Sequence, residues 1–188
     1  MHLKRRLAVL FVSMLAATAG ALVAGTSAQA DAGPQAGIAA WSDFPQNIVT
    51  YVGNKCLQPR SLAANALIEQ RTCDGSSKQK WRSQDAGGGF VKLVNAASGL
   101  CLDLVVNSEA EVVPGVLAQQ FYCSSVYTSE DFNRSRGSRV NHFQVWTRIR
   151  PTICLEVRGN SSSNGALIQI NGCSYYTTGQ QFRFNDTF

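Results

Sequence analysis

The sequence predicts an all-β fold made of three equivalent units. The stretch 90–103, FVKLVNAASGLCLD, combines an apolar strand pattern, a turn and a second short strand. It recurs as FQVWTRIRPTICLE at 143–156 and, more weakly, as PQNIVTYVGNKCLQ at 45–58. No stretch of ten or more residues after Trp41 shows helical periodicity. Short strands at regular spacing indicate a β-sandwich or barrel, and three equal units indicate pseudo-threefold symmetry.

The three units share one plan. In each copy a cysteine lies eleven positions after the start, followed by a small-residue turn, another strand, a second cysteine and a loop. Each unit then ends on a Gln/Glu-x-aromatic triplet, whose aromatic residue is Trp81, Phe132 or Phe182. Each unit has room for four short strands, so we expect about twelve in all. The aromatic residues recur once per unit, which predicts that they form a shared hydrophobic core.

Six cysteines fall two to a unit, at spacings of 17, 22 and 19 residues. Six cysteines permit fifteen pairings, and the repeat favours the one that is local in every copy. The predicted disulfides are Cys56–Cys73, Cys101–Cys123 and Cys154–Cys173. Each closes a loop of about 20 residues, which the loop-entropy model equates with about 3 kcal/mol. Free buried thiols are the alternative. A metal site is not indicated, because the chain has no CxxC pair.

Residues 1–30 have the pattern of a secretory signal peptide. Three basic residues, an apolar Ala-rich segment at 7–23 and a small-x-small cleavage site at 28–30 follow one another. A membrane anchor is the alternative, but Ser, Thr and Gly dilute the apolar segment. We therefore expect a secreted, extracellular protein in an oxidising compartment, where disulfides persist. A flexible lead-in is expected at 31–40 and a single domain at 41–188.

The charge of the chain does not indicate a nucleic-acid partner. Without the three basic residues of the leader, the 17 basic residues fall to 14 against 12 acidic residues, a net charge of +2. The basic residues are scattered, apart from Arg134, Arg136 and Arg139, which we expect on one loop. A solvated loop is the plain interpretation of this cluster, and an anionic partner such as an acidic glycan is the alternative.

The second unit has the longest loops. Its inter-cysteine segment carries NSEAEVVPG at 107–115, and its closing loop, 133–142, is two residues longer than the counterpart in the first unit. Insertions in repeat proteins lie in surface loops, and such loops often carry function.

The repeated cysteine, leucine and acid/amide triplet, with a second cysteine and the Gln/Glu-x-aromatic triplet, makes the chain resemble the ricin B-type lectin domain. The resemblance covers 41–188, and the Ala-rich leader resembles those of secreted actinobacterial proteins. It implies a β-trefoil of three pseudo-symmetric repeats with three intra-repeat disulfides, and carbohydrate binding at up to one shallow site per repeat. In such a site an acid after Cys-Leu accepts sugar hydroxyl groups, and an aromatic ring two residues before the second cysteine stacks on the sugar.

Transferred residue by residue, the resemblance places a sugar site in the second repeat. Asp103 stands at the acid position and Phe121 at the stacking position. Gln119, two residues before Phe121, stands where the family has a residue that lines the pocket. In the family an Asn just before the Gln-x-aromatic triplet donates to a sugar hydroxyl group. Here Ser129 replaces that Asn, and Glu130 replaces the Gln of the triplet. An ionised Glu130 cannot donate a hydrogen bond, and near Asp103 it would raise the pKa of one carboxyl group. The alternative is that Asp103 caps a turn and Phe121 fills the core.

The other two repeats match the pattern less well. The third offers a weaker second site, made of Glu156, Gln169, Asn171 and Gln180. Its weakness is that Asn171 provides no ring, and Gly179 stands where the donor would be. In the first repeat none of the corresponding residues matches; they are Gln58, Glu69, Arg71 and Lys78.

The sequence does not indicate an enzyme or a cofactor. Outside the leader His142 is the only histidine, and Asp103 with Glu130 is the only carboxyl pair that could serve a glycosidase. We expect a glycan or polysaccharide as the ligand, no nucleic acid and no membrane span. The alternative is a secreted protein-binding or inhibitor module, which would contact a protein partner through the second-repeat loops.

Overall fold

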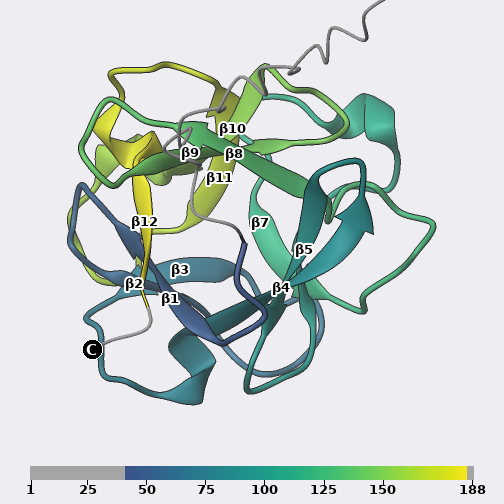
Figure 1. Cartoon of the computed structure of the whole chain (residues 1–188), viewed down its shortest axis with the longest axis horizontal. Coiled ribbons are helices and arrows are strands. Elements are labelled where there is room, and N and C mark those ends of the chain that lie inside the picture. Colours follow the sequence, from purple (N-terminus) through teal and green to yellow (C-terminus); the bar gives the residue numbers. More distant parts are fainter. Residues whose placement is uncertain (1–40, 186–188) are drawn as a thin grey trace, which may run out of the picture. The chain divides into compact units, whose positions relative to one another are not determined.

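The computed structural model describes residues 41–185, so the signal peptide and lead-in expected at 1–30 and 31–40 lie outside the described residues. Twelve strands form one antiparallel sheet, four from each repeat (Figure 1). The first repeat contains β1 (Gln46–Thr50), β2 (Cys56–Pro59), β3 (Ile68–Arg71) and β4 (Lys80–Gly87). The second contains β5 (Phe90–Asn95), β6 (Cys101–Leu104), β7 (Ala118–Phe121) and β8 (Phe132–Arg136). The third contains β9 (Phe143–Thr147), β10 (Ile153–Val157), β11 (Ile168–Gly172) and β12 (Phe182–Asn185).

The helical elements of the described chain are four short 3-10 turns. They are η1 (Ser77–Gln79), η2 (Glu109–Glu111), η3 (Arg158–Asn160) and η4 (Thr178–Gln180). Each turn contains only three residues, so the prediction of an all-β fold is confirmed. Within residues 41–185, no helix has the length and apolar composition needed to span a membrane.

The strand pairing closes a six-stranded barrel. Around the ring β1 pairs with β4, β4 with β5, β5 with β8, β8 with β9, β9 with β12, and β12 with β1. The remaining strands form one hairpin per repeat, β2–β3, β6–β7 and β10–β11. Single bridges join neighbouring hairpins, at Leu67–Gln119, Leu117–Gln169 and Glu69–Leu167. A closed barrel leaves no free sheet edge, and three hairpins on it make the β-trefoil that the sequence predicted.

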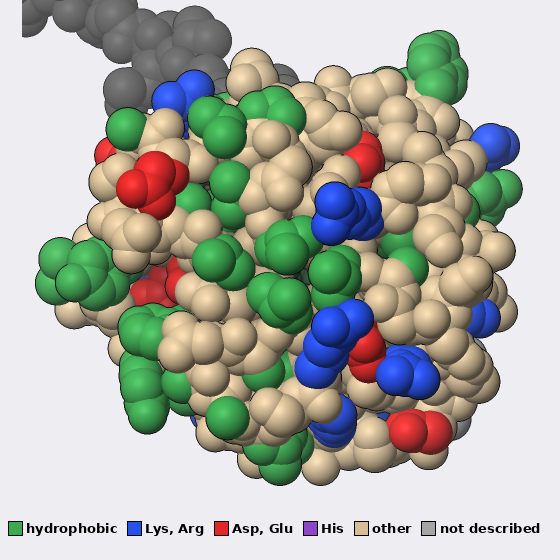
Figure 2. All heavy atoms as spheres, turned by 180° about the vertical axis from the view of Figure 1, so that it is seen from behind, with side chains coloured by type: hydrophobic (Ala, Val, Ile, Leu, Met, Phe, Trp, Pro, Cys, Tyr) green, Lys and Arg blue, Asp and Glu red, His purple; other side chains and the backbone are tan. Residues whose placement is uncertain are grey.

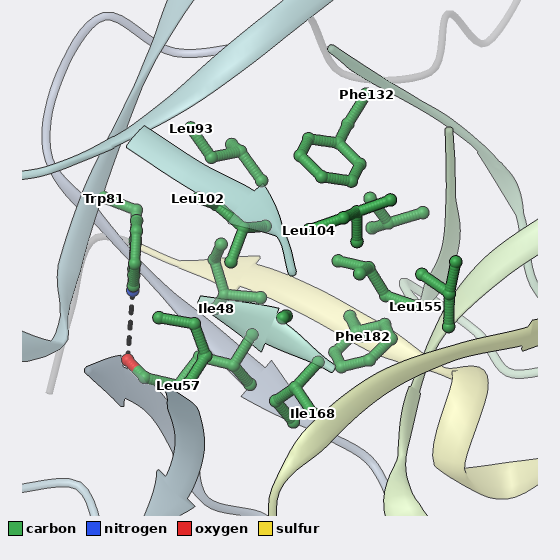
Figure 3. Packing of buried hydrophobic residues seen from close by; sticks show 14 of the residues in the cluster. Ile48, Leu57, Trp81, Leu93, Leu102, Leu104, Phe132, Leu155, Ile168 and Phe182 are labelled. Atoms are coloured by element: carbon green, nitrogen blue, oxygen red, sulfur yellow. Dashed lines mark hydrogen bonds between the residues drawn. The ribbon is translucent and has the colours of Figure 1, made fainter. Parts of the chain in front are cut away.

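The core lies inside the barrel and under the hairpins (Figure 3). Trp81, Phe132 and Phe182 are almost fully buried, as predicted, and the Trp81 Nε1 donates to the Leu57 carbonyl oxygen at 3.0 Å. Burying a side chain of this size contributes about 1.5–3 kcal/mol. The repeated leucines of the cysteine-leucine pairs, Leu57, Leu102 and Leu155, are buried beside them.

All six cysteines are paired, and the three predicted disulfides are confirmed. They join Cys56 to Cys73, Cys101 to Cys123 and Cys154 to Cys173. Each bridge ties the first strand of a hairpin to the loop that follows its second strand. Each disulfide therefore holds the start of the loop that follows a hairpin against the first strand of that hairpin.

The third repeat departs by one residue from the ungapped alignment of the three copies. The residue pairs joined at equivalent points of the sheet are Val49–Cys56, Val94–Cys101 and Trp146–Cys154. The last pair is one residue further apart in sequence than the others, so the turn between β9 and β10 contains one extra residue. A one-residue shift in a strand exchanges the faces on which its side chains point.

In the ungapped alignment of the copies at 90–103 and 143–156, Trp146 falls at the position of Leu93, and the shift corrects this placement. Val145 is fully buried and takes the core position of Leu93, whereas Trp146 is half-buried and packs edge-on against Phe90, at 5.3 Å between ring centroids. Gln144, Val145 and Trp146 lie within β9, so this sequence is part of a strand and is not the Gln-x-aromatic triplet that ends a repeat.

The predicted arginine loop is also corrected. Arg134 and Arg136 lie on β8, and only Arg139 lies in the loop that follows. The Arg134 side chain is buried, and its guanidinium lies 4.3–4.7 Å from the ring centroids of Trp41, Phe143 and Phe184. Burial lowers the pKa of Arg134 to about 10. Phe132 and Arg134 lie two residues apart on β8, so their side chains share its buried face, and Arg134 packs there against the three aromatic rings.

Candidate functional site

A pocket of about 560 Å³ lies over the second repeat. Its walls come from β6, β7, the segment 105–109 and the loop 122–130, with Asn65 from the first repeat and Ile149 from the third. The five residues predicted for the sugar site all line it: Asp103, Gln119, Phe121, Ser129 and Glu130. The tertiary structure thus brings together residues that are up to 27 positions apart in sequence.

The acid and lining residues face each other across the hairpin. Asp103 on β6 and Gln119 on β7 are register partners, and Gln119 Nε2 donates to Asp103 Oδ2 at 3.0 Å. Both side chains are buried. Phe121, at the end of β7, is half-buried and contacts Tyr122 edge-on at 5.4 Å instead of joining the core. A carboxylate and an aromatic ring therefore line the same pocket.

Glu130 lies under the pocket in a buried ion-pair network. Its Oε1 accepts from the Ser124 backbone N at 2.5 Å and from Lys92 Nζ at 3.0 Å. Lys92 Nζ also donates to Asp131 Oδ1 at 2.6 Å, and Arg148 binds the other oxygen of Asp131 at 3.1 Å. Burial raises the pKa of Glu130, with a smaller upward contribution from the charge of Asp103, against the opposing effect of Lys92. The pKa rise expected from Asp103 is present, but desolvation is its main cause.

The equivalent residue in the other repeats is a glutamine that donates to the acid position. Gln180 Nε2 donates to Glu156 Oε2 and to the Gly172 carbonyl oxygen, both at 2.9 Å. In the first repeat Gln79 Nε2 donates to Gln58 Oε1 at 2.9 Å and to the Thr72 carbonyl oxygen at 3.0 Å. These are the same two contacts at symmetry-related points of the fold.

The second repeat lacks this donor. The Oε1 atom of Gln180 accepts from the Ser174 backbone N at 2.8 Å, as Glu130 Oε1 does from Ser124. The Oε2 atom of Glu130 therefore takes the place of the donating amide nitrogen. Glu130 Oε2 and Asp103 Oδ1 are both buried and have no hydrogen-bond partner among residues 41–185. Each unpaired buried acceptor costs about 1–3 kcal/mol.

The four residues of the weaker site also come together, but they satisfy one another. Glu156 accepts from Gln169 Nε2 at 3.0 Å, from Asn171 Nδ2 at 3.2 Å and from Gln180 Nε2 at 2.9 Å. At the donor position a Cβ atom on Gly179 would lie 2.5 Å from Asn160 Oδ1, so no side chain fits there without a rearrangement. Among the described residues, the third repeat therefore has no unpaired acceptor at its acid position and no ring at its stacking position, where Asn171 stands.

In the first repeat, ion pairs occupy the positions that correspond to the sugar site. Glu69 forms ion pairs with Arg71 at 2.8 Å and with Arg60 at 3.1 Å. Burial raises the pKa of Glu69, but hydrogen bonds and charges from the two arginines outweigh it and lower the pKa overall. Gln58 donates to the same carboxylate at 3.3 Å, and Lys78 Nζ donates to the Arg60 carbonyl oxygen at 2.9 Å. This arrangement agrees with the absence of a sugar pattern in the first repeat.

Sequence reasoning missed several residues of the second-repeat pocket. Glu109 comes from the long inter-cysteine loop and Tyr127 from the loop that follows Cys123. Asn65 comes from the preceding repeat, where it has a φ of 64° that Asn tolerates better than most residues. Lys92 was also missed. A signal for it exists, since the chain has Lys at 92 where its structural counterpart is Gln144, and Glu at 130 where its counterpart is Gln180.

One group of side chains in the described part of the chain has the spacing of metal ligands, but it cannot bind a metal. Sulfur and oxygen atoms of Cys101, Cys123 and Glu130 lie within 4.8 Å of one another. The two sulfurs are joined in a disulfide, which leaves no thiolate to bind a metal.

Comparison with known proteins supports the ricin B-type lectin family. The family model described as ricin-type beta-trefoil lectin domain-like matches residues 46–123, which span the first repeat and the second as far as its second cysteine. No curated protein matches the chain.

Solved structures show the same fold. The designed threefold-symmetric protein ThreeFoil is 26% identical, with a TM-score of 0.69, over 76% of this chain and 99% of its own. An exo-beta-1,3-galactanase from Clostridium thermocellum is also 26% identical, with a TM-score of 0.67, over 76% of this chain but only 30% of its own. The Macrolepiota procera ricin B-like lectin, solved in complex with lactose, is 15% identical, with a TM-score of 0.64, over 78% of this chain and 97% of its own. Together with the family match, these likenesses support a carbohydrate-binding module in general.

Proposed function

We propose that the protein is a secreted carbohydrate-binding module with one shallow sugar site, in the second repeat. The observation that carries the proposal is the pocket in which Asp103, Gln119 and Phe121 meet. A sugar presents hydroxyl groups on one side and C–H groups on the other, and a carboxylate beside an aromatic ring is complementary to both. The family match, which includes the β6–β7 hairpin, supports the same function.

The second repeat is favoured over the third by its open acceptor. Asp103 keeps one oxygen without a partner among the described residues, whereas Glu156 accepts from three side-chain amides of its own repeat. A sugar hydroxyl that displaced those amides would exchange one hydrogen bond for another, with little net gain.

A single shallow site binds weakly. It offers few desolvated hydrogen bonds, so we expect a Kd on the order of 1 mM, or about −4 kcal/mol. Useful avidity would need several sites on one surface. With one open site, the monomer should not agglutinate cells.

A protein-binding module remains the second candidate, and one observation favours it. Tyr122, Val126 and Tyr127, on a loop of the second repeat, line the pocket and are nevertheless largely exposed. Contiguous exposed apolar side chains often mark protein interfaces. A glycan array compared with a pull-down from culture fluid distinguishes the two functions.

The proposed secretion rests on the leader at 1–30. Protein recovered from culture fluid should begin at or near Asp31, as determined by N-terminal sequencing. A membrane-bound form that retains Met1 would contradict the proposal.

The site is tested by sugar titration of single variants, followed by NMR. Asp103→Ala should abolish detectable binding, because a charged hydrogen bond contributes about 1.5–3 kcal/mol. Phe121→Ala should weaken binding similarly by removing the stacking surface. Both should stay folded, since Gln119 Nε2 also donates to the Leu104 carbonyl oxygen and Phe121 lies outside the core.

The matched control is Glu156→Ala in the third repeat. It should leave binding unchanged but lower the Tm, because it removes the acceptor of three side-chain amides. Loss of binding in this variant, with binding retained in Asp103→Ala, would move the site to the third repeat. Unfolding of Asp103→Ala would instead give this residue a structural role.

A further inference from the structure

The pocket of the second repeat is lined by acidic side chains without basic ones. Asp103, Glu109 and Glu130 contribute carboxyl groups, and the described residues that line the pocket include no Lys or Arg. Figure 2 shows one face of the molecule, on which acidic side chains at the left lie beside hydrophobic ones, whereas those in the middle and on the right lie near basic ones.

The nearest cations are already engaged behind the pocket. Lys92 and Arg148 bind Glu130 and Asp131, which balances two positive charges against two negative ones. Asp103 and Glu109 form no salt bridge within residues 41–185; Glu109 Oε1 accepts only a neutral hydrogen bond, from the Thr128 hydroxyl at 2.8 Å. The pocket therefore has an excess of negative charge.

Two acceptors at the floor of the pocket also need a donor. Asp103 and Glu130 are 7% and 2% exposed, and each has a buried oxygen with no partner among the described residues. In the other repeats a glutamine amide donates at this point, from Gln79 or Gln180. An ionised Glu130 offers only acceptors, so in that state the donor for these two oxygens has to come from outside the residues that line the pocket.

We propose that this pocket selects a sugar with a free amino group, such as a hexosamine, over its neutral and acidic counterparts. The inference rests on the proposed carbohydrate-binding function and names the ligand class of that site. An ammonium group carries three donors and a positive charge, whereas a hydroxyl supplies one neutral donor. The rings of Phe121, Tyr122 and Tyr127 line the same pocket, and the faces of aromatic rings attract cations.

The test compares three classes of probe on the intact protein at about pH 6.5, where a primary amine carries its proton. The probes are the methyl glycosides of galactosamine and glucosamine, of their N-acetyl derivatives, and of the corresponding uronic acids. We expect the amino sugar to bind about tenfold more tightly than the N-acetyl sugar, and the uronic acid to bind least. Binding is measured by NMR titration.

Two variants make the test specific. Glu130→Gln supplies the amide that the other repeats have, so the amino sugar should lose its advantage and the affinity ratio should fall to about one. Glu109→Gln, at an exposed position on the rim, should lower the ratio about twofold and is a second measure if the buried variant folds poorly.

The outcomes separate this inference from the proposed function. Equal binding of amino and N-acetyl sugars, with loss of both in Asp103→Ala, overturns the amino-sugar preference and leaves the sugar site in place. A tenfold preference that persists in both Glu130→Gln and Glu109→Gln overturns the role given to the carboxylates. No binding of any probe overturns the sugar site and this inference together.

Discussion

The second and third repeats place different polar side chains at equivalent positions of the same hairpin. Each has a disulfide-tied hairpin, a lining glutamine on its second strand and a buried acid on its first. In the third repeat, Gln180 donates to the acid and Gln144 Nε2 donates to Gln180 Oε1 at 3.0 Å. In the second, Glu130 and Lys92 stand at these two positions. One pocket is thereby satisfied from within, and the other is left with two open acceptors.

The paired exchange explains how a buried Glu130 is tolerated. The Oε1 atom of Glu130 faces Lys92 and the Ser124 backbone N, so the charge is compensated on that side. The Oε2 atom faces the acid position, where the exchange supplied no donor. The exchange of one amide for a carboxylate is thus enough to leave two acceptors unpaired on a hairpin that the other repeats also have.

The largest expected effect is on stability and comes from Lys92. Lys92→Met should lower the free energy of unfolding by about 3–5 kcal/mol, because it leaves a buried carboxylate without its partner. The matched variant of the third repeat, Gln144→Met, should cost only about 1 kcal/mol, since Gln180 Oε1 keeps its bond to the Ser174 backbone N. Urea unfolding at neutral pH measures both. Equal losses would show that the ion pair is no more important than the amide pair.

A second, intermediate effect concerns pH. Burial raises the folded pKa of Glu130 above the ordinary value of 4.5, so the folded protein retains a proton that the unfolded chain has released. The free energy of unfolding should therefore fall as the pH rises from about 4.5 through the folded pKa of Glu130. Glu130→Gln removes this dependence, and its stability relative to wild type should increase over the same range. Urea midpoints between acid and neutral pH test the prediction.

Glu69 of the first repeat is the control of opposite sign. Arg71 and Arg60 lower its pKa below 4.5, so its contribution to stability is present above that pH and is lost as the pH falls through the folded pKa. Glu69→Gln should thus be less stable than wild type at neutral pH and approach it in acid. If both variants changed stability in the same direction, the assigned environments of the two carboxyl groups would be wrong.

The smallest effect is expected from grafting the open site onto the third repeat. Glu156→Asp combined with Asn171→Phe supplies an aspartate and a ring, but Gln169 and Gln180 still donate to the acid. We expect a second set of NMR shifts around β10 and β11, with a Kd on the order of 10 mM. A grafted site as strong as the natural one would show that the internal donors do not limit binding.

Most of the fold could be predicted from the sequence because its signals are local or repeated. Two cysteines per unit indicated the disulfides, and one aromatic residue per unit, Trp81, Phe132 or Phe182, indicated the core. The one-residue insertion in the third repeat was missed, since the strand pattern of β9 fits either register until Val145 and Trp146 are placed against the barrel. The burial of Arg134 was missed because its partners Trp41 and Phe184 lie at opposite ends of the domain's sequence and meet only in the fold.

For the candidate site, the sequence by itself determined which residue types stand at the sugar-site positions. Asp103, Gln119 and Phe121 follow from the spacing of the second repeat around its two cysteines. Only the tertiary structure decided which acceptors are open. The partner of each buried oxygen depends on side chains from other strands, as Lys92 of β5 does for Glu130, and such pairings leave no periodic signal in the chain. Packing decides which distant residues form hydrogen bonds, so these pairs can be identified only from the closed barrel and not from the sequence.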